Sequence, residues 1–260
     1  MKPRVLILGP SGRMGRALIE AAAGRSDLAL TAAVDREGAP GLGSDVAPGV
    51  RSTSDLEPGL AACDVYVDFT APAATAAVAR VATARRRAAV VGTTGLGRDA
   101  EAALAELAAV APIVVAANFS LGVNVLLGLA QRAARALADW DAEIAEIHHG
   151  GKRDAPSGTA LAIARAIAAG RGLDYERVKR QSRDGDVGPR TADEIGVMAI
   201  RGGDVIGEHT AYFFGASERI EIVHRATSRS IVAVGALHAA AWAVHQPPGR
   251  YDMLDVLGLK

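Results

Sequence analysis

The stretch "VLILGPSGRMGR", residues 5–16, predicts the fold of the amino-terminal half of the chain. Its apolar part is typical of a buried strand over residues 5–9, and a helix is predicted over residues 13–24. In the turn between them, Gly9 permits a tight bend, Gly12 lets the backbone approach a pyrophosphate, and Gly15 lets helix and strand pack closely. This order of strand, glycine turn and helix indicates a dinucleotide-binding unit.

The spacing of the turn is G-x-x-G-x-x-G, and Ser11 occupies the place of the second glycine in the common G-x-G-x-x-G pattern. Asp35 stands twenty residues after Gly15, at the end of a second predicted strand over residues 28–35, where its carboxylate can accept hydrogen bonds from an adenosine ribose. Arg36 follows and could bind a 2′-phosphate instead. These residues predict NADH or NADPH as cofactor; the alternative is a surface Asp-Arg pair in a turn.

The same alternation of short apolar runs and Ala-rich segments continues through the first half of the chain. It predicts strands over 64–70, 88–94 and 112–119 and helices over 72–86 and 98–109. Apolar strands separated by helices favour a parallel sheet that is covered on both faces. The loops "GTT" (92–94) and "AANF" (116–119) follow two of these strands, at the sheet edge where ligands bind, although each could be a plain strand-ending turn.

The second half of the chain has a different pattern. A helix near 122–138, a strand ending at two adjacent histidines and a helix over 157–169 precede a polar loop over 182–194. Strands over 195–200, 204–214 and 218–226 follow, joined by the turns "RGGD" and "GASE", and in the last strand Ile220 and Ile222 alternate with charged residues. We therefore expect a smaller α+β domain with an antiparallel meander. The uncharged helical stretch 230–246 could belong to either domain.

The composition excludes several classes of partner. Half of the residues are apolar, and 29 basic residues balance 29 acidic residues, so no overall charge attracts nucleic acid or an anionic membrane. The uncharged segment 107–131 is interrupted by Pro112 and Asn118 and is expected to be core, not a membrane span. The single cysteine, Cys63, favours a reducing compartment, and the first predicted strand begins too early for a signal peptide.

The stretch "EIHHGGKRDAPSGTA", residues 146–160, gathers the residues best suited to catalysis. In the predicted strand, Glu146 and His148 share one face and His149 points to the other. The two glycines that follow let the chain turn, which brings Lys152 near the histidines. The stretch therefore offers a titratable imidazole and an ammonium group together.

The end of this stretch is typical of a helix start. Asp154, Pro156 and Ser157 are residues that favour the first positions of helices. The amides of Gly158 and Thr159 then fall in the first turn, where they can bind an anion. We expect a substrate carboxylate at this helix end.

Three interpretations of the stretch compete. The histidines could simply end a strand before a well-capped helix. A metal site is less suitable, because adjacent histidines do not readily bind one ion and no H-x-x-x-H or cysteine cluster is present, so no metal is predicted. A proton-donor site for a dicarboxylate explains the whole set best.

At this point the chain resembles the dihydrodipicolinate reductase (4-hydroxy-tetrahydrodipicolinate reductase) family of lysine and diaminopimelate biosynthesis. The motifs that carry the resemblance occur in the family's order from end to end: "GRMGR", "DVYVDFT", "VVGTTG", "AANFSLGVNVL", "HHGGKRDAPSGTA", "GEHTAYF" and "ERIEIVHRATSR". The run from the two histidines to "SGT" is highly specific to the family, whereas the glycine turn is not.

The resemblance implies an α/β fold, with a Rossmann-type parallel sheet domain over 1–120, a smaller α+β substrate-binding and oligomerisation domain over 121–229, and a segment 230–260 that returns to the first domain. It implies that His148 is the general acid/base, that Lys152 is a proton donor, and that His149, Gly158 and Thr159 hold the substrate. It implies a cytoplasmic homotetramer assembled through the substrate-domain sheets. The residues implied in binding NADH or NADPH are Gly9, Pro10, Ser11, Gly12, Arg13, Met14, Asp35, Arg36, Gly92, Thr93, Thr94, Ala116, Ala117, Asn118 and Phe119.

The family's reaction fits these residues. Its cyclic substrate carries two carboxylates and an imine, and once water is lost, hydride can add to a ring carbon distant from the nitrogen. Negative charge then develops along the conjugated system, where Lys152 would stabilise it and His148 could deliver the proton. Two positions depart from the common pattern: Ser11 in the glycine turn, and Gly150-Gly151, where some members have bulkier, basic residues.

Two other functions remain open at this point. A nicotinamide-binding sensor would keep the dinucleotide loops but has no use for His148 and Lys152 as proton donors. A reductase of another imine dicarboxylate is also compatible, because fold and cofactor do not fix the substrate. The preference between NADH and NADPH, and whether the enzyme itself dehydrates its substrate, are not decided by these residues.

Overall fold

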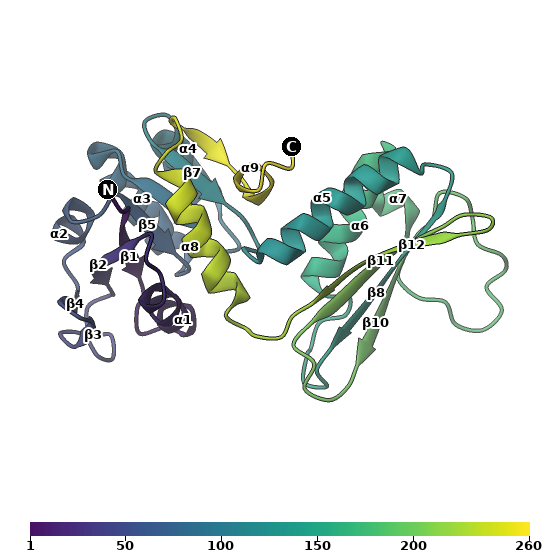
Figure 1. The fold of residues 1–260 in the computed structure, drawn as a ribbon, viewed down its shortest axis with the longest axis horizontal. Helices are drawn as coiled ribbons and strands as arrows, with labels where there is room; N and C mark the ends of the chain where they lie inside the picture. Colours follow the sequence, from purple (N-terminus) through teal and green to yellow (C-terminus); the bar gives the residue numbers. More distant parts are fainter. The chain divides into compact units, whose positions relative to one another are not determined.

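The computed structural model describes residues 1–260, which form two compact units. Domain 1 comprises Met1–Leu121 and Ser230–Gly258, and domain 2 comprises Gly122–Arg229 with Leu259–Lys260 (Figure 1).

Domain 1 is built on an eight-stranded sheet in the order β13-β7-β6-β5-β1-β2-β4-β3. All neighbouring strands in it pair in parallel except β3 and β4, which are antiparallel. The central strands are nearly or fully buried, as expected for a sheet with both faces covered. The strands are β1 (Arg4–Leu8), β2 (Ala29–Val34), β3 (Asp45–Ala47), β4 (Val50–Thr53), β5 (Val65–Asp68), β6 (Ala88–Val91), β7 (Pro112–Val115) and β13 (Gly249–Tyr251).

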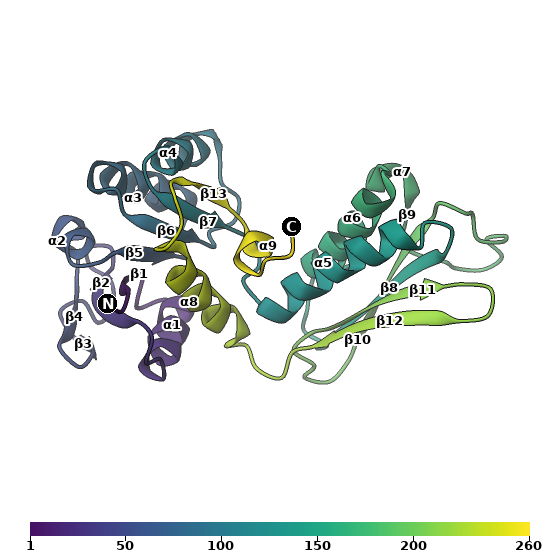
Figure 2. The ribbon, with the colours of Figure 1, turned by 45° about the horizontal axis from the view of Figure 1, so that its top comes forward.

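Two apolar clusters hold helices to the two faces of this sheet (Figure 2). One cluster joins α1, α8 and α9 to the sheet, and the other joins α2, α3 and α4 to the opposite face. Helix α8 buries most of its small and apolar side chains within domain 1, whereas Val234 and His238 are exposed. The helices are α1 (Arg13–Ala23), α2 (Leu56–Ala61), α3 (Pro72–Arg85), α4 (Arg98–Ala108), α8 (Ile231–Ala243) and α9 (Met253–Val256).

Domain 2 contains a five-stranded sheet in the order β12-β11-β8-β10-β9. Its helices pack on one face of the sheet through a cluster that includes Leu126 of α5, Ile163 of α6 and Ile144 of β8 (Figure 2). The elements are α5 (Leu121–Ala136), β8 (Asp141–His148), α6 (Gly158–Arg171), α7 (Tyr175–Val178), β9 (Lys179–Arg180), β10 (Ile195–Arg201), β11 (Glu208–Phe214) and β12 (Arg219–Arg225). The predicted fold class, a Rossmann-type domain with a smaller α+β domain, is confirmed.

The predicted antiparallel meander is wrong. Strand β10 runs parallel to β8, and β11 pairs antiparallel with the other side of β8, so only β11 and β12 form a hairpin. The "RGGD" segment is not a tight hairpin turn but part of a longer connection that crosses the end of β8. His149 donates its backbone N–H to the carbonyl of Val205 at 2.7 Å, and Gly150 donates to Gly203 at 3.1 Å. A connection of this length can step over one strand, which a two-residue hairpin loop cannot do.

The alternation expected in β12 is also only partly correct. Ile222 packs against the domain 2 core, but Ile220 is 42% exposed because β12 is an edge strand and the helices do not reach its end. On the other face, Val223 is exposed as well, so that face is not simply polar.

The remaining differences concern short elements and one apolar segment. Strands β3, β4, β9 and β13 and helices α2, α7 and α9 have six residues or fewer and were not expected from periodicity. The uncharged segment 107–131 is divided between the end of α4, β7 and the first part of α5. No helix of the chain is long and apolar enough to cross a membrane.

Candidate functional site

The glycine turn of domain 1 lies between β1 and α1, as predicted. Gly9 adopts a φ of 65°, which favours glycine, and its N–H donates to the carbonyl of Val34 at 2.8 Å. A Cβ on Gly15 would lie 2.0 Å from the carbonyl oxygen of Gly9. The turn can therefore be this tight only with glycine at residue 15.

Asp35 is held at the end of β2 by hydrogen bonds from this turn. Its Oδ2 accepts from the N–H of Ser11 at 3.0 Å and from the Ser11 hydroxyl at 2.6 Å, and its Oδ1 accepts from the N–H of Arg36 at 2.8 Å. Burial raises the pKa of Asp35, but these hydrogen bonds and the charge of Arg36 outweigh it and hold the pKa below its usual range. Ser11 thus fixes an ionised carboxylate beside the turn.

A cavity of about 530 Å³ opens in domain 1 between the turn, the end of β2 and helix α3. Its walls are mainly apolar, with Asp35 and Arg36 at one side. A concave, mostly apolar site with a few placed polar groups is typical of small-molecule and cofactor binding. Its lining includes Gly9, Ser11, Gly12, Leu56, Phe69, Thr70, Ala71, Ala74 and Val78. The cavity lies at the residues predicted to bind the adenosine half of a dinucleotide, with the glycine turn at its rim.

The other expected cofactor residues lie at the carboxyl ends of β6 and β7. Because β1, β5, β6 and β7 are parallel neighbours, these ends share one edge of the sheet with the glycine turn. A Cβ on Gly92 would lie 2.0 Å from the Phe69 ring, so this position admits only glycine. Thr94 and Ala117 are exposed and Asn118 is partly buried, whereas Pro10 and Phe119 are buried and could meet a ligand only through their backbone.

Asp68 organises this edge and was missed by the sequence analysis. It is fully buried at the end of β5, and its carboxylate accepts from the N–H and hydroxyl of Thr70 at 2.9 and 2.5 Å. It also accepts from the hydroxyls of Thr75 at 2.6 Å and Thr93 at 3.2 Å. A charged residue ending an apolar strand was the signal available in "DVYVDFT". Asp68 ties the loop after β6 to the loop after β5.

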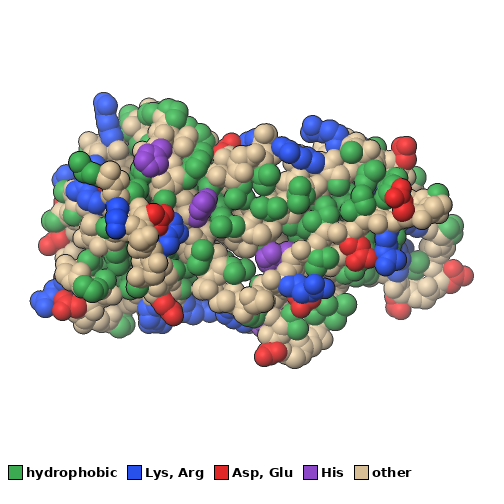
Figure 3. All heavy atoms as spheres, in the orientation of Figure 1, with side chains coloured by type: hydrophobic (Ala, Val, Ile, Leu, Met, Phe, Trp, Pro, Cys, Tyr) green, Lys and Arg blue, Asp and Glu red, His purple; other side chains and the backbone are tan.

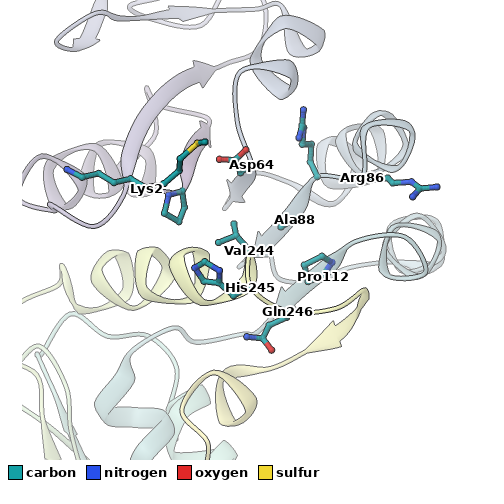
Figure 4. Close-up of a pocket in the computed structure, with 11 residues that line it drawn as sticks. Lys2, Asp64, Arg86, Ala88, Pro112, Val244, His245 and Gln246 are labelled. Carbon is teal, nitrogen blue, oxygen red and sulfur yellow. The ribbon is translucent and has the colours of Figure 1, made fainter.

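A second hollow of about 320 Å³ lies at the opposite edge of the same sheet (Figure 4). Asp64, Ala88 and Pro112 line it at the amino ends of β5, β6 and β7, together with His245 and Gln246 after α8. Ligands of open parallel sheets bind at the carboxyl ends of the strands. This hollow is therefore not the expected cofactor site.

In domain 2, His148 lies on the inner face of the sheet next to a buried carboxylate. Glu146 is fully buried, and its Oε2 lies 2.5 Å from Nδ1 of His148. Arg201 donates to both oxygens of Glu146, at 2.9 and 2.8 Å, and the N–H of Ser157 donates to Oε1 at 3.0 Å. Burial raises the pKa of Glu146, but the hydrogen bonds from Arg201, His148 and Ser157 outweigh it and keep the pKa low.

Lys152 and His149 lie in the turn that follows β8. The N–H of Lys152 donates to the carbonyl of His149 at 3.1 Å, and its ammonium is 2.9 Å from the Asp154 carboxylate. This contact holds the pKa of Asp154 below its usual range. Ser157 then caps α6, because its hydroxyl accepts from the N–H of Ala160 at 3.2 Å. Gly158 begins the helix, as expected.

Two further histidines line the inner face and were not singled out from the sequence. The ring centroids of His148 and His209 are 5.2 Å apart, and those of His209 and His224 are 6.3 Å apart. His209 Nε2 lies 3.2 Å from the Ser157 hydroxyl. His209 of β11 and His224 of β12 are opposite each other in the strand pairing, and only this pairing brings them together. Burial lowers the pKa of His209 to about 4, and the charges of His148, His224 and Lys152 add to this.

No group of three or more His, Cys, Asp or Glu side chains is arranged to hold a metal ion. The face of the molecule drawn in Figure 3 carries interspersed acidic and basic side chains, in line with a net charge of zero.

The depressed pKa of His209 predicts a pH-dependent stability. Its pKa is 6.5 in an ordinary environment and about 4 in the fold, so the unfolded chain binds more protons between these pH values. The free energy of unfolding should therefore fall as the pH drops through this interval, by up to about 3 kcal/mol, since one pKa unit is worth about 1.4 kcal/mol. We expect His209→Gln to flatten this dependence in denaturant titrations, leaving a smaller slope from His224, whose pKa burial also lowers. His238→Gln, at an exposed position of domain 1, is the control, and an unchanged slope in His209→Gln would contradict the assignment.

Two family models match almost the whole chain: "Dihydrodipicolinate reductase, N-terminus" over residues 3–119 and "Dihydrodipicolinate reductase, C-terminus" over residues 122–257. A curated relative from Alkalilimnicola ehrlichii, named 4-hydroxy-tetrahydrodipicolinate reductase, is 48% identical and is matched over 100% of both chains. A relative of the same name from Cereibacter sphaeroides is 46% identical over 99% of this chain and 98% of its own.

Solved structures support the fold. A dipicolinate-bound dihydrodipicolinate reductase from Paenisporosarcina sp. TG-14 aligns with a TM-score of 0.82 over 98% of this chain and 99% of that chain, at 24% identity. A probable dehydrogenase from Thermotoga maritima aligns with a TM-score of 0.61 over 98% of this chain and 93% of that chain, at 11% identity. The resemblance carried by the sequence motifs is thus confirmed by full-length relatives, and the chain belongs to the dihydrodipicolinate reductase family.

Proposed function

We propose that this chain reduces 4-hydroxy-tetrahydrodipicolinate, through dihydrodipicolinate, to tetrahydrodipicolinate, with His148 and Lys152 at the reacting site. Membership of the family makes the chain a nicotinamide-dependent oxidoreductase of lysine and diaminopimelate biosynthesis. The observation that carries the proposed chemistry is His148 hydrogen-bonded to a fully buried, ionised glutamate, at the end of a strand that is followed by a lysine-bearing turn and a capped helix.

In the proposed reaction, domain 1 binds NADH or NADPH. The glycine turn would hold the pyrophosphate, the cavity beside it would hold the adenosine, and Gly92–Thr94 and Ala116–Phe119 would face the nicotinamide half. The bound dinucleotide supplies the hydride. The ionised Asp35 suits a ribose with free hydroxyls, whereas exposed Arg36 suits a 2′-phosphate, so both cofactors are proposed.

Domain 2 is proposed to bind the dicarboxylate. Helix α6 runs for 14 residues from Gly158, and the partial positive charge of its start favours a carboxylate there. Gly158, Thr159 and the ring of His149 would hold that carboxylate and so orient the substrate ring. The Lys152 ammonium stabilises the negative charge that develops as hydride adds, and His148 delivers the proton.

The sensor alternative is disfavoured by the surroundings of His148. A buried glutamate with a bidentate arginine is costly to desolvate and is not needed for dinucleotide binding. The other alternative, reduction of a different imine dicarboxylate, differs from the proposed reaction only in its substrate.

We also propose that the chain assembles as a homotetramer through the outer face of the domain 2 sheet. This face carries apolar side chains although no helix of the domain covers it: Ile200 is 51% exposed, Val223 41% and Phe214 37%. Tyr212 stacks on Phe214 with ring centroids 5.7 Å apart. Exposed apolar side chains on an uncovered sheet face are typical of a protein interface, and a self-complementary face gives a closed symmetric assembly. Location in the cytoplasm stays a prediction of the family resemblance.

Removal of either proposed proton-donor group should abolish reduction without loss of cofactor. We expect His148→Gln and Lys152→Ala to lower kcat about 10²- to 10⁴-fold, because a positioned acid or charge is lost in the transition state. NADH affinity, measured by fluorescence titration, should not change, because both residues lie in domain 2. His245→Gln, in the hollow of domain 1, is the matched control, and equal loss of cofactor binding in the first two variants would contradict the assigned roles.

The proposed assembly predicts the effect of a charge on the outer face. Ile200→Asp should dissociate the tetramer into smaller species, because a carboxylate would be buried without a partner. Size-exclusion chromatography with light scattering measures this. Val234→Asp is the matched control, since Val234 is 43% exposed but lies on α8 of domain 1. An Ile200→Asp tetramer as stable as the wild type would contradict the proposed interface.

A further inference from the structure

The carboxylate of Glu146 receives hydrogen bonds from every side. At Oε2 it meets Nδ1 of His148 and Nη1 of Arg201, at 2.5 and 2.9 Å, and at Oε1 it meets the N–H of Ser157 and Nη2 of Arg201, at 3.0 and 2.8 Å. Arg201 is itself fixed, because Nη2 also donates to the carbonyl of Asp154 at 2.7 Å. Both carboxylate oxygens of Glu146 therefore accept hydrogen bonds from donors whose positions are fixed.

Only one of these four partners can change its role. A backbone N–H and a guanidinium always donate, whereas an imidazole nitrogen either donates or accepts. Since a carboxylate can only accept, the imidazole must present its Nδ1 as N–H. The other nitrogen, Nε2, then carries the exchangeable proton of the imidazolium and becomes bare when that proton leaves.

The surroundings of Nε2 fit this role. The ring of His148 forms its hydrogen bond to Glu146 through Nδ1, and Nε2 lies beside Gly207, where any Cβ would come within 2.9 Å of it. The absence of a side chain at Gly207 leaves room at the reactive nitrogen.

We propose that Glu146, clamped by Arg201, is a positioning residue that keeps the proton of neutral His148 on Nδ1 and so reserves Nε2 for proton transfer to the substrate. The inference rests on the proposed function of His148. In the step it serves, the hydride supplies the electron pair to the substrate ring, and the Nε2–H bond of the imidazolium breaks to give the ring its proton. The remaining imidazole is the tautomer that Glu146 stabilises, and Glu146 stays ionised throughout.

The variant Glu146→Gln separates this role from that of a plain ion pair. Its amide nitrogen would meet two fixed donors at the Oε1 position, from Ser157 and Arg201. At the Oε2 position it would meet one fixed donor and the ring of His148, which can present a bare nitrogen. The amide nitrogen therefore takes the Oε2 position, and neutral His148 moves its proton to Nε2.

The test is ¹⁵N NMR of the full-length enzyme labelled on its six histidines, with His148 assigned by the signal missing in His148→Gln. At alkaline pH, where imidazoles are neutral, wild-type His148 should show a protonated Nδ1 and a bare Nε2. Glu146→Gln should show the reverse, with kcat lower by about 10²- to 10⁴-fold and an unchanged dinucleotide Kd.

The matched control is Glu143→Gln on the same strand. Glu143 is also bound by arginines, with Arg183 at 3.0 and 2.7 Å and Arg190 at 3.1 Å, but it lies on the other face of β8 and contacts no histidine. Neither the tautomer of His148 nor the dinucleotide Kd should change in it.

A wild-type spectrum with the proton on Nε2 would overturn the proposal, even if Glu146→Gln did not fold. A Glu146→Gln enzyme that loses kcat without a tautomer change, or changes tautomer at full kcat, would also overturn it. If the wild-type enzyme does not reduce the substrate, the proposed function fails. The tautomer is measured without substrate and still decides the positioning role.

Discussion

The proposed catalytic site of domain 2 depends on one buried carboxylate. Glu146 has no contact with water, so its charge is tolerable only because Arg201, Ser157 and His148 all donate to it. These partners come from β10, the start of α6 and β8 itself, so a single group joins three elements of domain 2. The same bonds that satisfy the carboxylate orient the imidazole and anchor the residue that caps α6. The hydrogen bonds of Glu146 therefore both orient His148 and stabilise the local fold of domain 2.

The unexpected pairing of β10 with β8 makes this arrangement possible. In the parallel register Arg201 lies opposite His148, which places its guanidinium over Glu146. The meander expected from the sequence would pair β10 directly with β11, whereas in the structure β8, which carries Glu146, lies between these two strands. The correction to the topology thus also explains the electrostatics of the site.

The parts that the sequence predicted well are those encoded locally. The strand, glycine turn and helix of domain 1 are contiguous, as are the strand end, turn and helix start from His148 to Gly158, so the sequence predicted their local structure. Arg201, His209 and Asp68 were missed because their importance comes from strand pairing or burial, which hydrophobic periodicity does not report. Short strands such as β9 were not predicted for a related reason, because two residues are too few to show a hydrophobic periodicity.

The two domains prepare their ligand sites by different physical means. In domain 1, the loops around the proposed ligand site pack closely because Gly15 and Gly92 have no side chain. A Cβ at either position would collide with backbone or ring atoms. Domain 2 relies on charge held out of water, where electrostatic interactions are stronger. The first strategy serves a cofactor shared by many enzymes, and the second serves one reaction. Under the proposed function, substrate choice is determined in domain 2, although the nucleotide fold is easier to recognise.

The central claim is that hydride passes from the nicotinamide to the dehydrated dicarboxylate on this protein. The most direct measurement uses NADH deuterated at its transferable position, with 4-hydroxy-tetrahydrodipicolinate generated in situ, and analyses the product by mass spectrometry. We expect tetrahydrodipicolinate that carries a single deuterium from the cofactor. Tight cofactor binding with no labelled product would contradict it and favour a sensor or a reductase of a different imine.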